Sequence, residues 1–220
     1  MLPRVHLVRH GQGYHQMDPL ENNRQIHDPY LTEIGIEKCC KFNDFFPEYV
    51  HLDLVCASPM RRTIQTAAYC FANRIPKTSQ GNILLQPLAQ ENTSEPCDVG
   101  SNLGTLKDEF GSMIDLSHVP EDWYVKKGTN ASTPDALRER ARLLRHWLRD
   151  RQERDIVIVG HGTFWDYVTD AFGQDGHHSQ SPWANCEWRF FHFASDTDED
   201  ARLVEDRESI SRRQTLNILG

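Results

Sequence analysis

Histidine and arginine occur where the chain leaves two predicted buried strands. Arg9 and His10 follow the apolar run RVHLV, and His161 follows the run DIVIVG. Each histidine precedes a glycine, which lets the backbone approach a ligand closely. One histidine at a strand end is usually structural, but two strand–His–Gly units, LVRHG and IVGHG, are much less expected by chance. The pair therefore indicates a polar ligand site to which both strands contribute.

Two adjacent arginines lie near the start of a predicted helix over 58–72. Ser58 is typical of an N-cap and Pro59 of the first helical position, which places Arg61 and Arg62 in the first turn. The helix dipole already puts positive charge there, so arginine is unfavourable unless an anion binds. Arg62 and the helix N-terminus together predict a phosphate site, although the sequence contains no P-loop or GxGxxG motif.

An acidic residue completes this set. Glu91 lies in the stretch LAQENTS, just beyond a predicted strand over 82–88. Ligands of open α/β sheets bind beyond the carboxyl ends of the strands. We therefore expect Glu91 on the same rim as His10, Arg62 and His161.

The elements that must position these residues alternate between strand and helix. Apolar runs predict strands over 4–8, 52–57, 82–88 and 155–160, with a further edge strand over 186–193. Helical spacing predicts helices over 31–46, 58–72, 132–150 and 163–172. Because the run over 155–160 is apolar without alternation, it is typical of a parallel strand. The pattern predicts an α/β fold, a three-layer sandwich with a mostly parallel central sheet flanked by helices.

The chain of 220 residues suits a single domain over 1–220. Residues of about 92–131 show no periodic pattern and predict a loop or cap insertion over the carboxyl ends of the strands. Loops of such length in a compact domain are usually functional. The charged stretch of about 195–220 predicts a polar, partly mobile C-terminal tail.

Composition excludes several classes of partner. The net charge of −8 argues against nucleic acid or an anionic membrane surface as the main partner. Six cysteines without CxxC pairs or zinc-ligand spacing predict a reducing compartment and no metal site. No signal peptide or apolar stretch of about 18 residues is evident, so we expect a cytoplasmic protein without a membrane span. The sequence does not indicate an oligomeric state.

Five motifs in order resemble the histidine phosphatase superfamily: LVRHGQGYHQ, DPYLTEIG, DLVCASPMRRTIQTA, QPLAQENTSEPCDVGS and IVIVGHGTF. Together they cover most of the chain and are similar to the phosphoglycerate mutase-like branch, which carries an RHG motif. The spellings RHGQGYH and PCDVGS are most similar to small phosphatase-like members of fungi and plants. The resemblance implies a metal-independent phosphomonoester hydrolase without a cofactor, acting on a small phosphorylated metabolite through a phosphohistidine.

The resemblance also implies roles for individual residues. His10 matches the nucleophile, and Glu91 falls where the family keeps its proton donor. Arg9 and Arg62 match the arginines that clamp the phosphoryl oxygens, which makes Arg61 a neighbour that points elsewhere. His161 matches the second histidine of the family.

Two further positions are expected to bind substrate. Gly162 follows the second histidine and lets the backbone approach the ligand closely. Gln16 stands where the family usually has asparagine, and its longer amide side chain would change the reach of one phosphate contact.

Three alternatives to a phosphatase remain open. A phosphoglycerate mutase-like phosphotransferase would need an NERxYG-type stretch where this chain has QENTSEPCDVG, and extra basic residues that we cannot place. A biosynthetic enzyme could use the same pocket for different chemistry. A non-catalytic binding module would have no chemical reason to retain all five catalytic residues. The sequence does not identify the substrate, because specificity would come from residues 92–131, which show no recognisable pattern.

Overall fold

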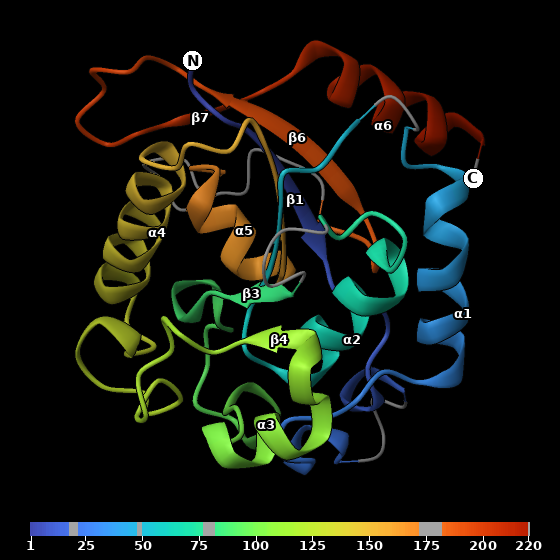
Figure 1. The fold of residues 1–220 in the computed structure, drawn as a ribbon, viewed down its shortest axis with the longest axis vertical. Coiled ribbons are helices and arrows are strands. Elements are labelled where there is room, and N and C mark those ends of the chain that lie inside the picture. The colour runs from blue at the N-terminus through green and yellow to red at the C-terminus, as the bar shows by residue number, and fades with distance from the viewer. Residues whose placement is uncertain (18–21, 48–49, 77–81, 172–181, 220) are drawn as a thin grey trace.

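The computed structural model describes residues 1–17, 22–47, 50–76, 82–171 and 182–219, within which seven strands form one mixed sheet (Figure 1). The strands are β1 (Arg4–Arg9), β2 (Leu54–Ala57), β3 (Ile83–Leu85), β4 (Ile114–Asp115), β5 (Asp155–Gly160), β6 (Trp188–Phe193) and β7 (Leu203–Glu205). The helices are α1 (Glu33–Lys41), α2 (Arg61–Phe71), α3 (Leu103–Phe110), α4 (Pro134–Arg149), α5 (Gly162–Val168) and α6 (Arg207–Leu219). None of these helices is long and apolar enough to cross a membrane.

The sheet order is β4-β3-β2-β5-β1-β6-β7, and β1 to β5 pair in parallel. Only β6 and β7 run antiparallel to their neighbours. The predicted α/β class with a mostly parallel sheet is therefore confirmed. The central pair β1 and β5 is in register with Arg9 opposite Gly160, and the His10 amide donates to the Gly160 carbonyl at 2.9 Å. This register brings both His–Gly units to one edge of the sheet.

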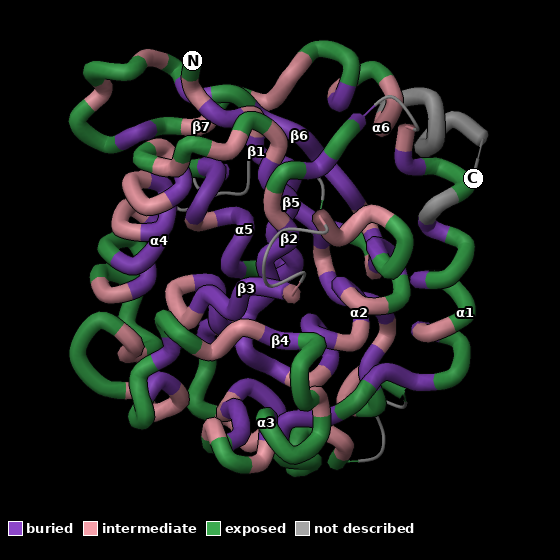
Figure 2. Tube along the Cα trace, viewed as in Figure 1, coloured by how far each residue is buried: buried purple, intermediate pink, exposed green. Residues whose placement is uncertain are grey.

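Helices cover both faces of the sheet, which gives the three layers (Figure 1). Buried side chains of α1 and α2 pack against one face, and those of α4 and α5 against the other. The central strands alternate between the two cores, because successive side chains of a strand point to opposite faces. Val157 and Val159 join the first core, whereas Ile156 and Ile158 join the second. Figure 2 shows the resulting buried interior.

The start of α2 differs from the prediction. The helix begins at Arg61, after the extended residue Met60, and Ser58 is not its N-cap. The Thr63 hydroxyl donates to the carbonyl oxygens of Ser58 and Met60, so it holds the extended approach to the helix. Arg62 nevertheless lies in the first turn, as predicted.

The predicted edge strand over 186–193 is also wrong in its position. Strand β6 lies between β1 and β7, because residues of the C-terminal segment pair with it. That segment, expected to be a mobile tail, contains β7 and α6. The Ser209 hydroxyl links them, donating to the Glu205 carboxylate at 2.7 Å.

The stretch over 92–131 is not purely irregular. It contains α3, capped by the Asn102 side chain, and the two-residue strand β4, which pairs with β3. These elements are too short to show a period in the sequence. The first part of the stretch borders the site described next.

Candidate active site

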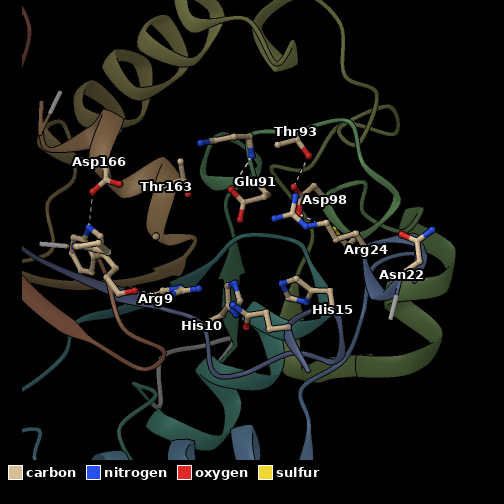
Figure 3. Close-up of a pocket in the computed structure, with 16 residues that line it drawn as sticks. Arg9, His10, His15, Asn22, Arg24, Glu91, Thr93, Asp98, Thr163 and Asp166 are labelled. Carbon is tan, nitrogen blue, oxygen red and sulfur yellow. Dashed lines mark hydrogen bonds between the residues drawn. The ribbon is translucent and has the colours of Figure 1, made fainter. Parts of the chain in front are cut away.

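A pocket of about 770 Å³ opens at the carboxyl ends of β1 and β5 (Figure 3). Five of the predicted residues line the pocket: Arg9, His10, Gln16, Glu91 and Gly162. The remaining lining residues are His15, Asn22, Arg24, Asn92, Thr93, Cys97, Asp98, Thr163, Asp166, Pro182 and Trp183. The predicted Arg62 and His161 are fully buried outside the lining, where Arg62 contacts His10 and His161 contacts Glu91. Such a volume suits a small-molecule ligand. The predicted rim therefore exists as a concave site.

His10 lies at the bottom of the pocket in one defined tautomer. Its Nδ1 is 2.7 Å from the Gly11 carbonyl oxygen, which can only accept, so Nδ1 carries a proton. Its Nε2 accepts from Arg62 Nε at 3.3 Å. Burial, followed by the Arg62 charge, lowers the pKa of His10 well below its ordinary value. The imidazole is therefore neutral, with an unprotonated Nε2.

Arg62 is fully buried, and its guanidinium is held by several acceptors. Nη1 donates to the Cys97 carbonyl at 2.7 Å, and Nη2 donates to Asp98 Oδ1 at 3.3 Å. Nη2 also lies 3.3 Å from His161 Nδ1. A rigid guanidinium with both histidines on its edge is well placed to bind oxygens of an anion.

His161 is fully buried, and its contact with Arg62 determines its tautomer. Because Arg62 can only donate, His161 Nδ1 accepts, and Nε2–H donates to Ser58 Oγ at 3.1 Å. Glu91 Oε2 also lies 3.3 Å from Nδ1. Burial and then the Arg62 charge lower the pKa of His161 well below its ordinary value. Because Nδ1 accepts in this tautomer, Glu91 can hydrogen-bond to it only when the carboxyl group carries the proton.

Glu91 lies just after β3 and a short 3₁₀ helix, Pro87–Ala89, which together position it. Its Oε1 accepts from the Asn92 amide at 2.9 Å, and its Oε2 is 3.9 Å from Arg62 Nη2. The side chain is 15% exposed, toward the pocket. The carboxyl group can therefore meet both the buried cations and a bound ligand.

Arg9 reaches the pocket from the end of β1. Its Nη1 donates to the Trp183 carbonyl, and its buried Nε has no hydrogen-bond partner among the described residues. A Cβ on Gly162 would lie 3.1 Å from Arg9 Cδ, so glycine leaves room for this side chain. The unpartnered Nε–H is a donor that a ligand can use.

Hydrogen bonds also fix the orientation of the Gln16 and Arg61 side chains. Gln16 Oε1 accepts from the Gly13 amide at 3.1 Å and from Asn185 Nδ2 at 3.2 Å. The NH₂ of the Gln16 amide is therefore the group that can donate into the pocket. Arg61 instead forms an ion pair with Glu109, so it points away from Arg62, as predicted.

Sequence reasoning missed four residues of this site. Ser58 was interpreted as a helix cap, whereas its hydroxyl binds His161. Asp98, in the stretch PCDVGS, accepts from Arg62 and from the Thr93 hydroxyl at 2.6 Å. Burial, and then Glu91, raise the pKa of Asp98. Lys126 and Arg140 bind the main chain beside Glu91, and no local pattern marks either of them.

Within the part of the chain that the structure describes, two groups of side chains have the composition of metal ligands. The atoms of His10, Glu91 and His161 lie within 4.8 Å of one another, as do those of Glu95, Cys97 and Asp98. The first group surrounds the Arg62 guanidinium, at 3.3 Å from each histidine. A divalent cation there would meet an adjacent positive charge. The donors of this site suit an anion better.

The fold and the site together define an α/β protein with two buried histidines and a buried arginine beside a pocket at the end of its central strands. The chain belongs to the histidine phosphatase superfamily (branch 1), whose family model matches residues 5–205.

Individual relatives share this fold or sequence. The chain is 25% identical to phosphoglycerate mutase-like protein 1 of Arabidopsis thaliana, across 84% of this chain and 79% of that protein. It is 28% identical to a Schizosaccharomyces pombe protein named a probable phosphatase, across 72% and 73% of the two chains. The crystal structure of phosphoserine phosphatase from Entamoeba histolytica, in complex with 3-phosphoglyceric acid, matches with a TM-score of 0.56 and 18% identity, across 93% of this chain and 95% of that chain. The last likeness concerns the fold alone.

Proposed function

We propose that the protein is a metal-independent phosphomonoester hydrolase that acts on a small phosphorylated metabolite through a phosphohistidine at His10. One observation carries the proposal: His10 is neutral, with Nδ1–H on the Gly11 carbonyl and an unprotonated Nε2 beside Arg62. Membership of the histidine phosphatase superfamily supports it, as does a curated relative named as a phosphatase.

In the first step, His10 Nε2 attacks phosphorus, so the P–N bond forms while the ester P–O bond breaks. Glu91 gives a proton to the departing oxygen, and the alcohol leaves. Arg9, Arg62 and His161 stabilise the negative charge on the equatorial oxygens. Losing one such donor typically costs about 2.7–4 kcal/mol of transition-state stabilisation.

In the second step, water attacks the phosphohistidine. The Glu91 carboxylate takes a proton from the water, the P–N bond breaks, and inorganic phosphate forms. His10 returns to its neutral state because Nδ1–H stays on the Gly11 carbonyl. Glu91 is protonated again for the next substrate, and the alternation between acid and base is consistent with its place beside His161.

The test is phosphate release from an aryl phosphate and from a panel of phosphorylated metabolites, with EDTA present. We expect wild-type activity that survives EDTA and is lost in His10→Ala. Acid-labile phosphate on the wild-type protein after rapid quenching would mark the phosphohistidine. Transfer to a second hydroxyl without phosphate release would favour the mutase-like alternative. No reaction by folded protein that still binds vanadate would favour a repurposed or non-catalytic pocket.

A further inference from the structure

Two cations from distant parts of the chain, the half-buried Lys126 and the buried Arg140, donate hydrogen bonds to the main chain at Glu91. Lys126 Nζ donates to the Glu91 carbonyl oxygen at 2.8 Å. Arg140 Nη2, from α4, lies 3.2 Å from the same oxygen and donates to the Gln90 carbonyl at 2.9 Å. The main chain that carries the acid/base carboxyl is thus held from outside its own turn.

Lys126 is itself held in a fixed place. Its Nζ also donates to Gln90 Oε1 at 2.9 Å, and Gln90 Nε2 donates to the Trp123 carbonyl at 3.0 Å. Trp123 is buried, and its Nε1 donates to the Ser101 carbonyl at 3.1 Å. A Cβ on Gly100 would lie only 2.0 Å from the Trp123 ring, so this packing requires glycine. The position of the Lys126 ammonium group therefore depends on the tight packing of Trp123 against Gly100.

This placement is electrostatically costly. Burial, and then the Arg140 charge, lower the pKa of Lys126 to about 7, while Glu91 acts in the opposite direction. Arg140 is fully buried, with its guanidinium over the Phe164 ring at 4.4 Å from the ring centre. Two neighbouring cations that are largely removed from solvent oppose folding unless specific partners compensate. The shared partner here is the Glu91 peptide.

We propose that Lys126, together with Arg140, is a positioning residue that fixes the Glu91 peptide so that its carboxyl group reaches the leaving-group oxygen. The inference rests on the proposed function. A general acid must lie within about 2.6–3.2 Å of the atom that it protonates. A displacement of about 1 Å can cost roughly 100-fold in rate. Lys126 therefore links the 92–131 stretch to the chemical step.

The test compares two substrates with Lys126→Met, which keeps the aliphatic stem but removes the donors and the charge. The value of kcat/KM covers the steps through phosphohistidine formation. An alkyl phosphate needs protonation of its leaving oxygen in these steps, whereas 4-nitrophenyl phosphate does not. We expect a loss of about tenfold or more in kcat/KM for the alkyl phosphate, and a change within about twofold for the aryl phosphate. Lys127→Met, at the exposed neighbour, is the matched control and should change neither value.

Equal losses on both substrates, or none, would overturn the positioning role. Glu91→Gln provides the benchmark, because it should show the same selectivity with a larger loss. If Glu91→Gln is not selective, the acid role of Glu91 fails, and the role of Lys126 fails with it. If Glu91→Gln is selective and Lys126→Met is not, only the Lys126 inference fails. Thermal unfolding is followed for each variant, and Lys126→Gln is judged by the same ratio if Lys126→Met does not fold.

Discussion

Ser58→Ala removes the acceptor of the His161 Nε2–H. Both residues are fully buried, and the Nε2–Oγ distance is 3.1 Å. When a phosphoryl group is bound, His161 must carry a proton on Nδ1 to donate to it, so the ring becomes a cation whose Nε2–H rests on Ser58. The variant leaves this N–H without its partner in the interior.

The expected magnitude follows from that hydrogen bond. A hydrogen bond to a charged group contributes about 1.5–3 kcal/mol. Expressed as a rate, this is a loss of roughly 10- to 150-fold in kcat/KM. Unlike Lys126→Met, the loss should be similar for alkyl and aryl phosphates, because both need stabilisation of the phosphoryl oxygens. The unpaired buried N–H should also lower the free energy of unfolding by about 1–3 kcal/mol.

The assay measures steady-state kinetics with an alkyl phosphate and with 4-nitrophenyl phosphate, and urea unfolding of the same samples gives the free energy of unfolding. Ser117→Ala, at an exposed serine outside the site, is the control and should match the wild type. Wild-type kcat/KM in a folded Ser58→Ala protein would refute the reasoning, since His161 would then not depend on Ser58 for its proton arrangement.

Two further predictions concern stability. Gly35→Ala should destabilise the protein by about 1–3 kcal/mol in urea unfolding, because its Cβ would lie 2.2 Å from the Gln12 carbonyl oxygen. Gly104→Ala, at an exposed position of α3 where the added Cβ would have no contact under 3.3 Å, should leave the free energy of unfolding unchanged. Equal destabilisation by the two substitutions would contradict the prediction. Burial, and then the Arg62 charge, lower the pKa of His15 to about 3, so its neutral form is favoured in the folded state. As pH falls below the unfolded pKa of about 6.5, the unfolded state binds a proton at His15 and the folded state does not. The free energy of unfolding therefore decreases by about 1.4 kcal/mol per pH unit until pH approaches the folded pKa of about 3, and above pH 6.5 this loss is absent. His15→Asn should make the dependence of unfolding free energy on pH flatter by that amount between about pH 5.5 and 4.5, and an unchanged slope would contradict it.

Much of the fold and part of the site could be predicted because the signals are local. The apolar runs before His10 and His161 mark parallel strands, and the carboxyl ends of such strands meet at one sheet edge. Arg62 was separable from Arg61 through the resemblance, and the ion pair of Arg61 with Glu109 agrees.

Other features depend on contacts that are distant in sequence. Ser58 has the local pattern of a helix cap, but its hydroxyl faces a histidine 103 residues away. Strand β6 looked like an edge because β7 is only three residues long. No local pattern marks Lys126, and only packing around Trp123 brings it to Glu91.

The sequence by itself determined the longer strands and helices of the α/β core, the family, and the residue types that meet at the rim, because hydrophobic period and short motifs are properties of neighbouring residues. The tertiary structure decided which ring nitrogen of each histidine carries a proton, which arginine is buried between them, and what holds Glu91 in place. These depend on hydrogen bonds and burial created only when segments far apart in the chain pack together.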